Sequence, residues 1–207
     1  MAENRFEMMR DYWRQRFLEM DQEGLIRRFN LVSDNTNLYI TYYCQPYQVD
    51  RATGTIRRCD RPNEDVPFSP LMSIYHLFCY SKPGAANSGV FVPFREVKGA
   101  APFAPAFEKT IAEGLARPFE GHLEMLQAAS AALNGMPVSQ GDAGYIFHAF
   151  ECMPVKMVFW DGDDEFPAQA NLLFDRNITD FTPEETLCCV AEDPMRRLRE
   201  EAKQRLG

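Results

Sequence analysis

The chain has 207 residues, and its 22 lysines and arginines against 30 aspartates and glutamates leave a formal net charge of −8 at pH 7. Nucleic acids and anionic membranes attract basic surfaces, so this acidic balance argues against both as partners. Hydrophobic residues make up 45% of the sequence and aromatic residues 13%, which excludes a disordered or low-complexity chain. A chain of this length can bury a core without disulfides or metals, and we expect a single domain over residues 1–207.

The N-terminal residues lack the basic start and apolar run of a secretory signal. No stretch approaches the ~18 consecutive apolar residues of a membrane-spanning helix. We therefore expect a cytoplasmic protein that does not enter a membrane. In that compartment its six cysteines, which form no C-x-x-C pair, are expected to be reduced thiols.

The first half of the chain changes from helical to strand periodicity and back. Apolar residues at steps of three and four predict an amphipathic helix over about residues 4–20. Residues 31–58 are rich in β-branched and aromatic types around a turn-like segment at 50–54, which predicts a small antiparallel hairpin or meander. Leu71–Tyr80 reads as a helix that is apolar nearly all round, so it should be central to the fold.

The second half repeats this clustering of helices and then strands. The spacing predicts a helix that ends at Arg117, and a second helix that begins at Pro118 and stops at Asn134–Gly135. Alternating residues near 144–174 predict a three-stranded antiparallel meander.

The C-terminal segment carries the signals of two helix starts. Thr182-Pro183-Glu184-Glu185 has the pattern of a capping box, and Asp193-Pro194 predicts the start of a last helix. Because strands and helices cluster along the chain, we expect an α+β fold with two small antiparallel sheets and about five to six helices.

The central helix supplies the sharpest candidate site. His76 and Cys79 stand three residues apart on one helical face, close enough to share a metal or to place His76 beside a flat metallocofactor. The alternative is a buried histidine whose nitrogens bond within the protein, beside a thiol that acts as a small apolar group.

A second pair lies in the predicted meander. His148 and Cys152 are four residues apart on a predicted strand, so both should face the same side of the sheet, opposite Glu151. On a strand with one face on the core, this pair could point into a cavity, as ligands, or into water, with a structural role only.

An acidic loop follows the second strand of the meander. It places four carboxylates within five residues, and such oxygens are ligands for magnesium or calcium; they belong to Asp161, Asp163, Asp164 and Glu165. The spacing is not that of an EF-hand, and acidic turns are commonly just solvated. No nucleotide-binding glycine motif, hydrolase serine motif or H-E-x-x-H motif is present, and no catalytic residue is identified.

The segment from Trp160 to Ala168, followed by Leu172–Asp175 and Phe181–Glu185, resembles domain-of-unknown-function family 3786 of bacteria and archaea. Val92-Pro-Phe-Arg-Glu96 and Met153-Pro154 match as well, together with the histidine-bearing helix, and the resemblance spans about residues 11–189. In that family the domain is sometimes joined to a four-cysteine iron–sulfur domain like that of corrinoid iron–sulfur proteins. The resemblance thus implies anaerobic redox or one-carbon metabolism and a redox or iron–sulfur protein as partner.

Three functions follow as hypotheses. The first is an accessory protein of anaerobic redox or corrinoid-linked metabolism that binds a small molecule, with a tetrapyrrole (corrinoid or haem) or a divalent metal as its cofactor. The second is a metal-assisted hydrolase or transferase that uses the acidic loop 161–165 with His148. The third is a protein-interaction module whose acidic face meets a redox enzyme.

Overall fold

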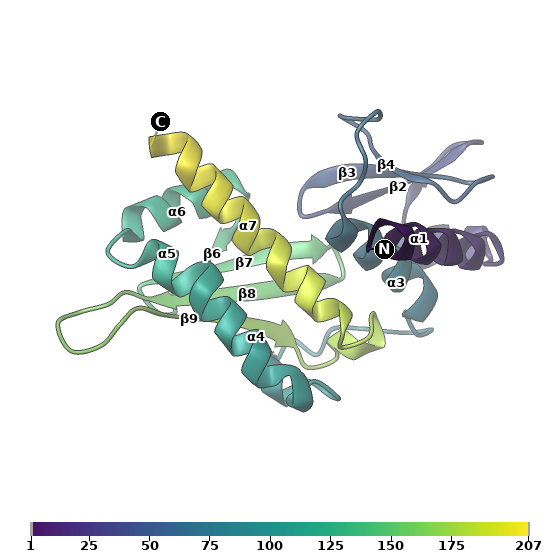
Figure 1. Ribbon diagram of the computed structural model, residues 1–207. Helices are drawn as coiled ribbons and strands as arrows, with labels where there is room; N and C mark the ends of the chain where they lie inside the picture. The colour runs from purple at the N-terminus through teal and green to yellow at the C-terminus, as the bar shows by residue number, and fades with distance from the viewer. Residues whose placement is uncertain (1, 207) are drawn as a thin grey trace.

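The structure, a computed structural model, describes residues 2–206 and has an α+β fold. Within these residues the strands form two antiparallel sheets, one of four strands and one of five. Figure 1 shows the smaller sheet beside the larger one, with α7 crossing one face of the larger sheet. The predicted fold class is confirmed.

The smaller sheet is a meander in which each strand pairs with the next one along the chain. Its strands are β1 (Val32–Ser33), β2 (Asn37–Tyr42), β3 (Gln45–Asp50) and β4 (Ile56–Arg58). In β2 every second side chain, from Leu38 to Tyr42, is buried, which is the pattern of a strand with one face on the core. The predicted antiparallel unit near residues 31–58 is therefore present.

The larger sheet has the spatial order β5-β9-β8-β7-β6. Its strands are β5 (Phe91–Pro93), β6 (Met136–Pro137), β7 (Ala143–Phe150), β8 (Met153–Trp160) and β9 (Gln169–Asp175). The predicted meander near residues 144–174 corresponds to the three central strands, and β5 and β6 extend it at its two edges.

The helices pack around and between the sheets, and α4, α6 and α7 lie over one face of the larger sheet (Figure 1). They are α1 (Ala2–Leu18), α2 (Gln22–Phe29), α3 (Phe68–Tyr80), α4 (Ala104–Ile111), α5 (Arg117–Phe119), α6 (Leu123–Ala132) and α7 (Thr186–Leu206). Short 3₁₀ turns occupy Phe94–Glu96, Ala101–Phe103 and Ile178–Asp180, and a π-helical turn occupies Ala112–Ala116. None of the helices within residues 2–206 is long and apolar enough to cross a membrane.

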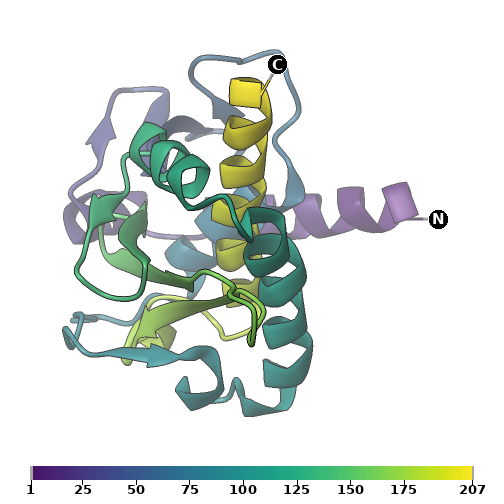
Figure 2. The same ribbon diagram turned by 90° about the vertical axis from the view of Figure 1, so that its left-hand side faces the viewer.

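Helix α3 lies at the centre of the molecule, as its all-round apolar sequence predicts. It packs against both α1 and α7, and Ile74, Tyr75 and Phe78 on it are completely buried. The Tyr75 hydroxyl donates a 2.7 Å hydrogen bond to the carbonyl of Gly54 in the turn before β4. In contrast, the N-terminal end of α1 points away from the rest of the molecule (Figure 2).

The prediction that Pro118 opens a new helix is wrong. The π-helical turn at Ala112–Ala116 continues into α5, so Pro118 lies inside a continuous helical run. A π turn bonds to the fifth rather than the fourth preceding carbonyl, and this wider geometry accommodates a residue that has no N–H. The chain instead breaks at Gly121, which has a positive φ of 69°.

The predicted capping box also does not form. Helix α7 begins at Thr186, four residues after Thr182, and the Thr182 hydroxyl is buried without a hydrogen-bond partner among the described residues. The Thr186 hydroxyl instead lies 2.6 Å from a ring nitrogen of His76. A contact with a distant helix has therefore overridden the local start signal.

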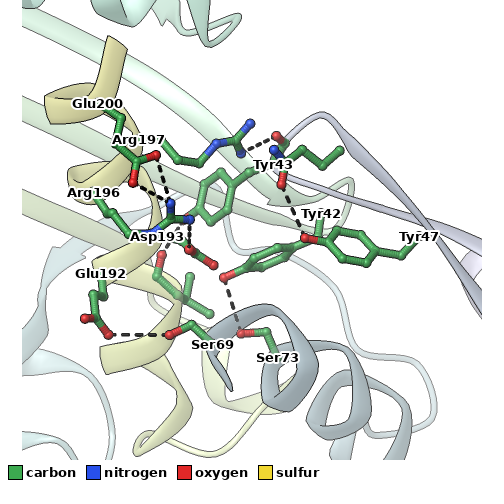
Figure 3. A network of polar contacts seen from close by, with 12 residues as sticks. Tyr42, Tyr43, Tyr47, Ser69, Ser73, Glu192, Asp193, Arg196, Arg197 and Glu200 are labelled. Atoms are coloured by element: carbon green, nitrogen blue, oxygen red, sulfur yellow. Dashed lines mark hydrogen bonds and ion pairs between the residues drawn. The ribbon is translucent and has the colours of Figure 1, made fainter. Parts of the chain in front are cut away.

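The expected helix start at Asp193–Pro194 is wrong as well, because α7 continues through Pro194 as one helix. Proline has no N–H, so the carbonyl four residues earlier, that of Val190, loses its donor within the helix. The hydroxyl of Tyr43 supplies the missing bond, at 2.6 Å from this carbonyl (Figure 3). Burial, and then the charge of Asp193, raise the pKa of Tyr43 well above its usual value, so its hydroxyl remains a proton donor.

The same hairpin makes a second contact with α7. Tyr43 and Cys44 form the two-residue turn between β2 and β3, with φ values of 44° and 61°. Positive φ at both positions is typical of a type I′ turn, which normally takes asparagine and glycine because larger L-residues are strained there. The guanidinium of Arg197 donates to the Tyr43 carbonyl and helps to hold this turn in place (Figure 3).

We predict that Tyr43→Phe lowers the free energy of unfolding by about 1–3 kcal/mol, because the Val190 carbonyl is then buried without a donor. Chemical denaturation measures this change. Pro194→Ala restores a backbone N–H to the helix, so Tyr43→Phe should cost clearly less in that background.

Tyr12→Phe is the matched control, since Tyr12 is 56% exposed, and its effect should stay within about 0.5 kcal/mol. An equal cost of Tyr43→Phe with and without Pro194 would contradict the role assigned to this hydrogen bond.

Candidate functional site

The two sheets meet where the β2–β3 turn contacts the end of β7. The backbone N–H of Tyr43 donates a 3.0 Å hydrogen bond to the carbonyl of Ala149. The ring of Tyr42 lies 5.0 Å from that of Phe150, measured between ring centroids. These contacts fix a seam between sheets that share no strand.

The structure separates His148 from Cys152 in a way the sequence did not predict. Strand β7 ends at Phe150, so Cys152 lies in the turn before β8 and not on the same strand as His148. The pairing register also shifts between His148 and Phe150, which marks a β-bulge. Because a bulge re-aims side chains, the two-residue alternation cannot be extended across this point. His148 is exposed and Cys152 is half-buried.

Three adjoining hollows run along the seam, and we call them together the seam groove. The central one has a volume of about 490 Å³, within the range of small-molecule sites. A second hollow of about 310 Å³ shares Thr41, Phe150 and Glu151 with it, and a third of about 410 Å³ shares Arg28, Phe29 and Cys152. The central hollow is lined by Arg28, Phe29, Asn30, Leu31, Val32, Tyr39, Ile40, Thr41, Leu77, Phe150, Glu151 and Cys152.

Both members of the second predicted pair line the seam groove, although in different hollows. His148 lies in the second hollow with Cys44, and Cys152 lies in the central and third hollows. The sequence analysis did not single out Cys44, because its position depends on the β2–β3 turn. It also missed Arg28 and Leu77, which come to the groove from α2 and α3 and carry no local signal of this role.

The polar groups of the seam groove include a half-buried thiol and two cations. Burial raises the pKa of Cys152 to about 12, so its thiol stays protonated at neutral pH and is a poor nucleophile. Arg28 donates a 2.8 Å bond to the Ser81 carbonyl, and Lys82 pairs with Asp180. Both residues line the third hollow, and these bonds leave each cation with further N–H donors.

His76 lies between α1, α3 and α7 and does not line the seam groove. Its Nδ1 is 2.6 Å from Oγ1 of Thr186 at the start of α7. Its ring packs edge-on against Trp13, with 4.4 Å between centroids, and against Tyr80. Nε2 is buried and has no hydrogen-bond partner in the described part of the chain. Burial lowers the pKa of His76 to about 4, so the ring is neutral at pH 7.

Cys79, the predicted companion of His76, contacts a different neighbour. Its Sγ lies 3.7 Å from Sδ of Met20, and burial raises its pKa to about 11. The two side chains share a helix face but have separate surroundings. A cofactor held by His76 and Cys79 together stays a prediction, and neither residue lines the seam groove.

The acidic loop is organised by its own backbone. Oδ1 of Asp161 accepts hydrogen bonds from the N–H groups of Gly121 and Gly162, at 2.7 and 2.9 Å. Oδ1 of Asp163 accepts two more at 2.8 Å from Glu165 and Phe166, which lower its pKa. Two of the predicted metal ligands therefore shape the loop, while the side chains of Asp164 and Glu165 are exposed.

Within residues 2–206, no three histidine, cysteine, aspartate or glutamate side chains are grouped as metal ligands would be. A metal bound by Asp161, Asp163, Asp164 and Glu165 stays a prediction.

Comparison with known proteins gives one match. The family model of a domain of unknown function (DUF3786) matches residues 21–197. No curated protein and no solved structure matches the chain. The matched region contains both sheets and the seam groove, and α1 lies outside it.

We predict that acid destabilises this protein partly through His76. The folded-state pKa of about 4 lies below the ordinary 6.5, so the unfolded chain binds a proton that the folded one excludes between these values. The stabilisation is present above about pH 6.5 and is lost as the pH falls towards 4.

His76→Asn keeps a hydrogen-bonding side chain for the Thr186 hydroxyl, but asparagine does not titrate between pH 4 and 6.5. It should therefore flatten the fall in unfolding free energy between pH 6.5 and 4.5, measured by urea denaturation at each pH. His122→Asn, at an exposed position, should leave the curve unchanged. Identical slopes for His76→Asn and the unaltered protein would contradict the prediction.

Proposed function

The chain belongs to the DUF3786 family, and we propose that it is a binding protein that holds a small-molecule cofactor in the seam groove. One observation carries this proposal. The largest of the described hollows lies at the junction of the two sheets, and hollows on either side extend it along the seam. Ligand sites commonly occur where separate layers of a fold meet, with a mainly apolar lining and few polar groups.

The lining favours a ligand with a broad apolar face. Aromatic and aliphatic side chains, such as Phe29, Leu77 and Phe150, form much of the central hollow. His148 lies in one outer hollow, while Arg28, which also lines the central hollow, lies with Lys82 in the other. A flat molecule with anionic substituents at one edge fits this distribution of charge.

A tetrapyrrole, either a corrinoid or haem, is the cofactor class that we propose first. The family resemblance supports it, and so does an exposed imidazole, that of His148, in a hollow that adjoins an apolar one. A neutral imidazole is a common axial ligand of such metals. Cys152 is the weaker candidate ligand, because its raised pKa disfavours the thiolate.

We place the protein as an accessory of anaerobic redox or corrinoid-linked metabolism, which carries its ligand to a redox or iron–sulfur partner. This assignment rests on the family resemblance and on a groove suited to holding a ligand.

The test is to titrate the purified protein with hemin and, separately, with hydroxocobalamin, and to record the absorption spectrum. Binding should shift the spectrum of one of them. His148→Ala should remove the shift or weaken binding by about tenfold or more, whereas His122→Ala, another exposed histidine, should behave like the unaltered protein.

Thr41→Trp provides a second variant that does not depend on coordination. Thr41 is exposed and lines two of the three hollows, so an indole there should obstruct the ligand without disturbing the core. Thr110→Trp on α4 is the control. Unaltered binding by Thr41→Trp, or no spectral response to either tetrapyrrole, would reject a tetrapyrrole in the seam groove.

A further inference from the structure

A fourth hollow, of about 320 Å³, lies between α1, β4 and α3 and shares no lining residue with the seam groove. We call it the arginine hollow, because three of its lining residues are arginines. It is lined by Arg10, Arg14, Thr55, Ile56, Arg57, Glu64, Asp65, Val66, Leu71 and Tyr75. Two of the arginines, Arg10 and Arg14, are four residues apart on α1 and so lie on one face of that helix.

The three guanidinium groups are held in place while keeping unused donors. Arg14 donates through Nε to the Thr53 carbonyl at 3.1 Å, and Arg57 donates to the Pro62 carbonyl at 3.1 Å. Arg10 is held less firmly. Its nearest acidic oxygen, on Glu7, lies 3.9 Å away, and the Nε of Arg10 is buried without a hydrogen-bond partner in the described residues. Each guanidinium has five N–H donors, so several remain for a ligand.

The three arginines set the chemistry of the ligand. The Arg10 side chain is 33% exposed while its Nε is shielded from solvent, so a ligand can meet this guanidinium only through its Nη donors. A guanidinium bonds two oxygens of a carboxylate or phosphate at once, which adds geometric selectivity.

The acidic side chains in the lining limit how much negative charge the ligand can carry. Glu64 lies 3.4 Å from Arg61, which is outside the hollow, and Asp65 stands next to it in the sequence. Three guanidinium groups line the hollow against two carboxylates, and Arg14 also pairs with Asp11 at 3.3 Å, which limits the ligand to a single anionic group. The remaining surface, which includes Ile56, Val66 and Leu71, suits an apolar body.

We propose that the arginine hollow binds a small organic oxyanion, in which one phosphate or carboxylate group meets Arg10 and Arg57 and an apolar body meets Ile56 and Leu71. Arg10 and Arg14 lie outside the region that matches the family, so the family match does not supply this site. It is also independent of the ligand proposed for the seam groove.

Calorimetric titration with phenyl phosphate, phenylacetate, inorganic phosphate and benzyl alcohol tests the proposal on the full chain. Phenyl phosphate or phenylacetate should bind, and which of them binds more tightly identifies the anionic group. Benzyl alcohol, which lacks the charge, should give no heat of binding, and inorganic phosphate should bind at least about tenfold more weakly.

Arg10→Gln and Arg57→Lys should each weaken binding by about tenfold. Lysine keeps the positive charge but lacks the paired N–H donors that bond two oxygens at once. Arg95→Gln is the charge-matched control, since Arg95 is exposed and pairs with Glu108 away from the hollow. Circular dichroism checks that each variant is folded.

Equal weakening in Arg95→Gln would show a general charge effect and overturn the site. Equal affinity for inorganic and phenyl phosphate would overturn the role of the apolar body, and the absence of binding by both aromatic anions would overturn the proposal as a whole.

Discussion

The hydrogen bond from the Tyr43 hydroxyl to the Val190 carbonyl joins the β2–β3 hairpin of the smaller sheet to α7, which lies over the larger sheet. Pro194 leaves that carbonyl without a donor inside α7, and a buried carbonyl needs one. The tyrosine comes from a hairpin turn that is itself strained, with positive φ at two non-glycine residues. The same contact therefore gives the Val190 carbonyl a donor and holds the strained turn on α7. Arg197 reinforces it by donating to the Tyr43 carbonyl.

This contact has a consequence for the seam groove. The β2–β3 turn is fixed on α7 by its side chain and carbonyl, and on β7 by the bond between Tyr43 N–H and the Ala149 carbonyl. The two sheets therefore meet at one anchored corner and do not form a continuous sheet. Side chains from α2, α3 and both sheets line the space that this arrangement leaves along the seam.

Several carboxylates of the molecule shape its loops by accepting hydrogen bonds from backbone N–H groups. Asp161 and Asp163 accept backbone N–H groups that define their loop. Asp175, fully buried at the end of β9, does the same for Ser88, Gly89 and Asn177. All three belong to the motifs that carry the family resemblance, so that resemblance reflects loop architecture. The two binding sites that we propose, the seam groove and the arginine hollow, combine arginines or a histidine with apolar surface.

The sequence by itself determined the α+β class, the two antiparallel sheets and the central position of Leu71–Tyr80, because periodicity and apolar content are local properties. It also brought His148 and Cys152 to attention, although not their separation by a bulge and a turn. The tertiary structure decided the rest. Helix α7 begins at Thr186, which contacts His76, and it runs through Pro194, where Tyr43 bonds the Val190 carbonyl; these contacts span 110 and 147 residues of chain. A helix start is predicted from a few neighbouring residues and from the position of a proline. The hydrogen-bonding partners from distant segments are not visible in that pattern, because they come into contact only when the chain folds.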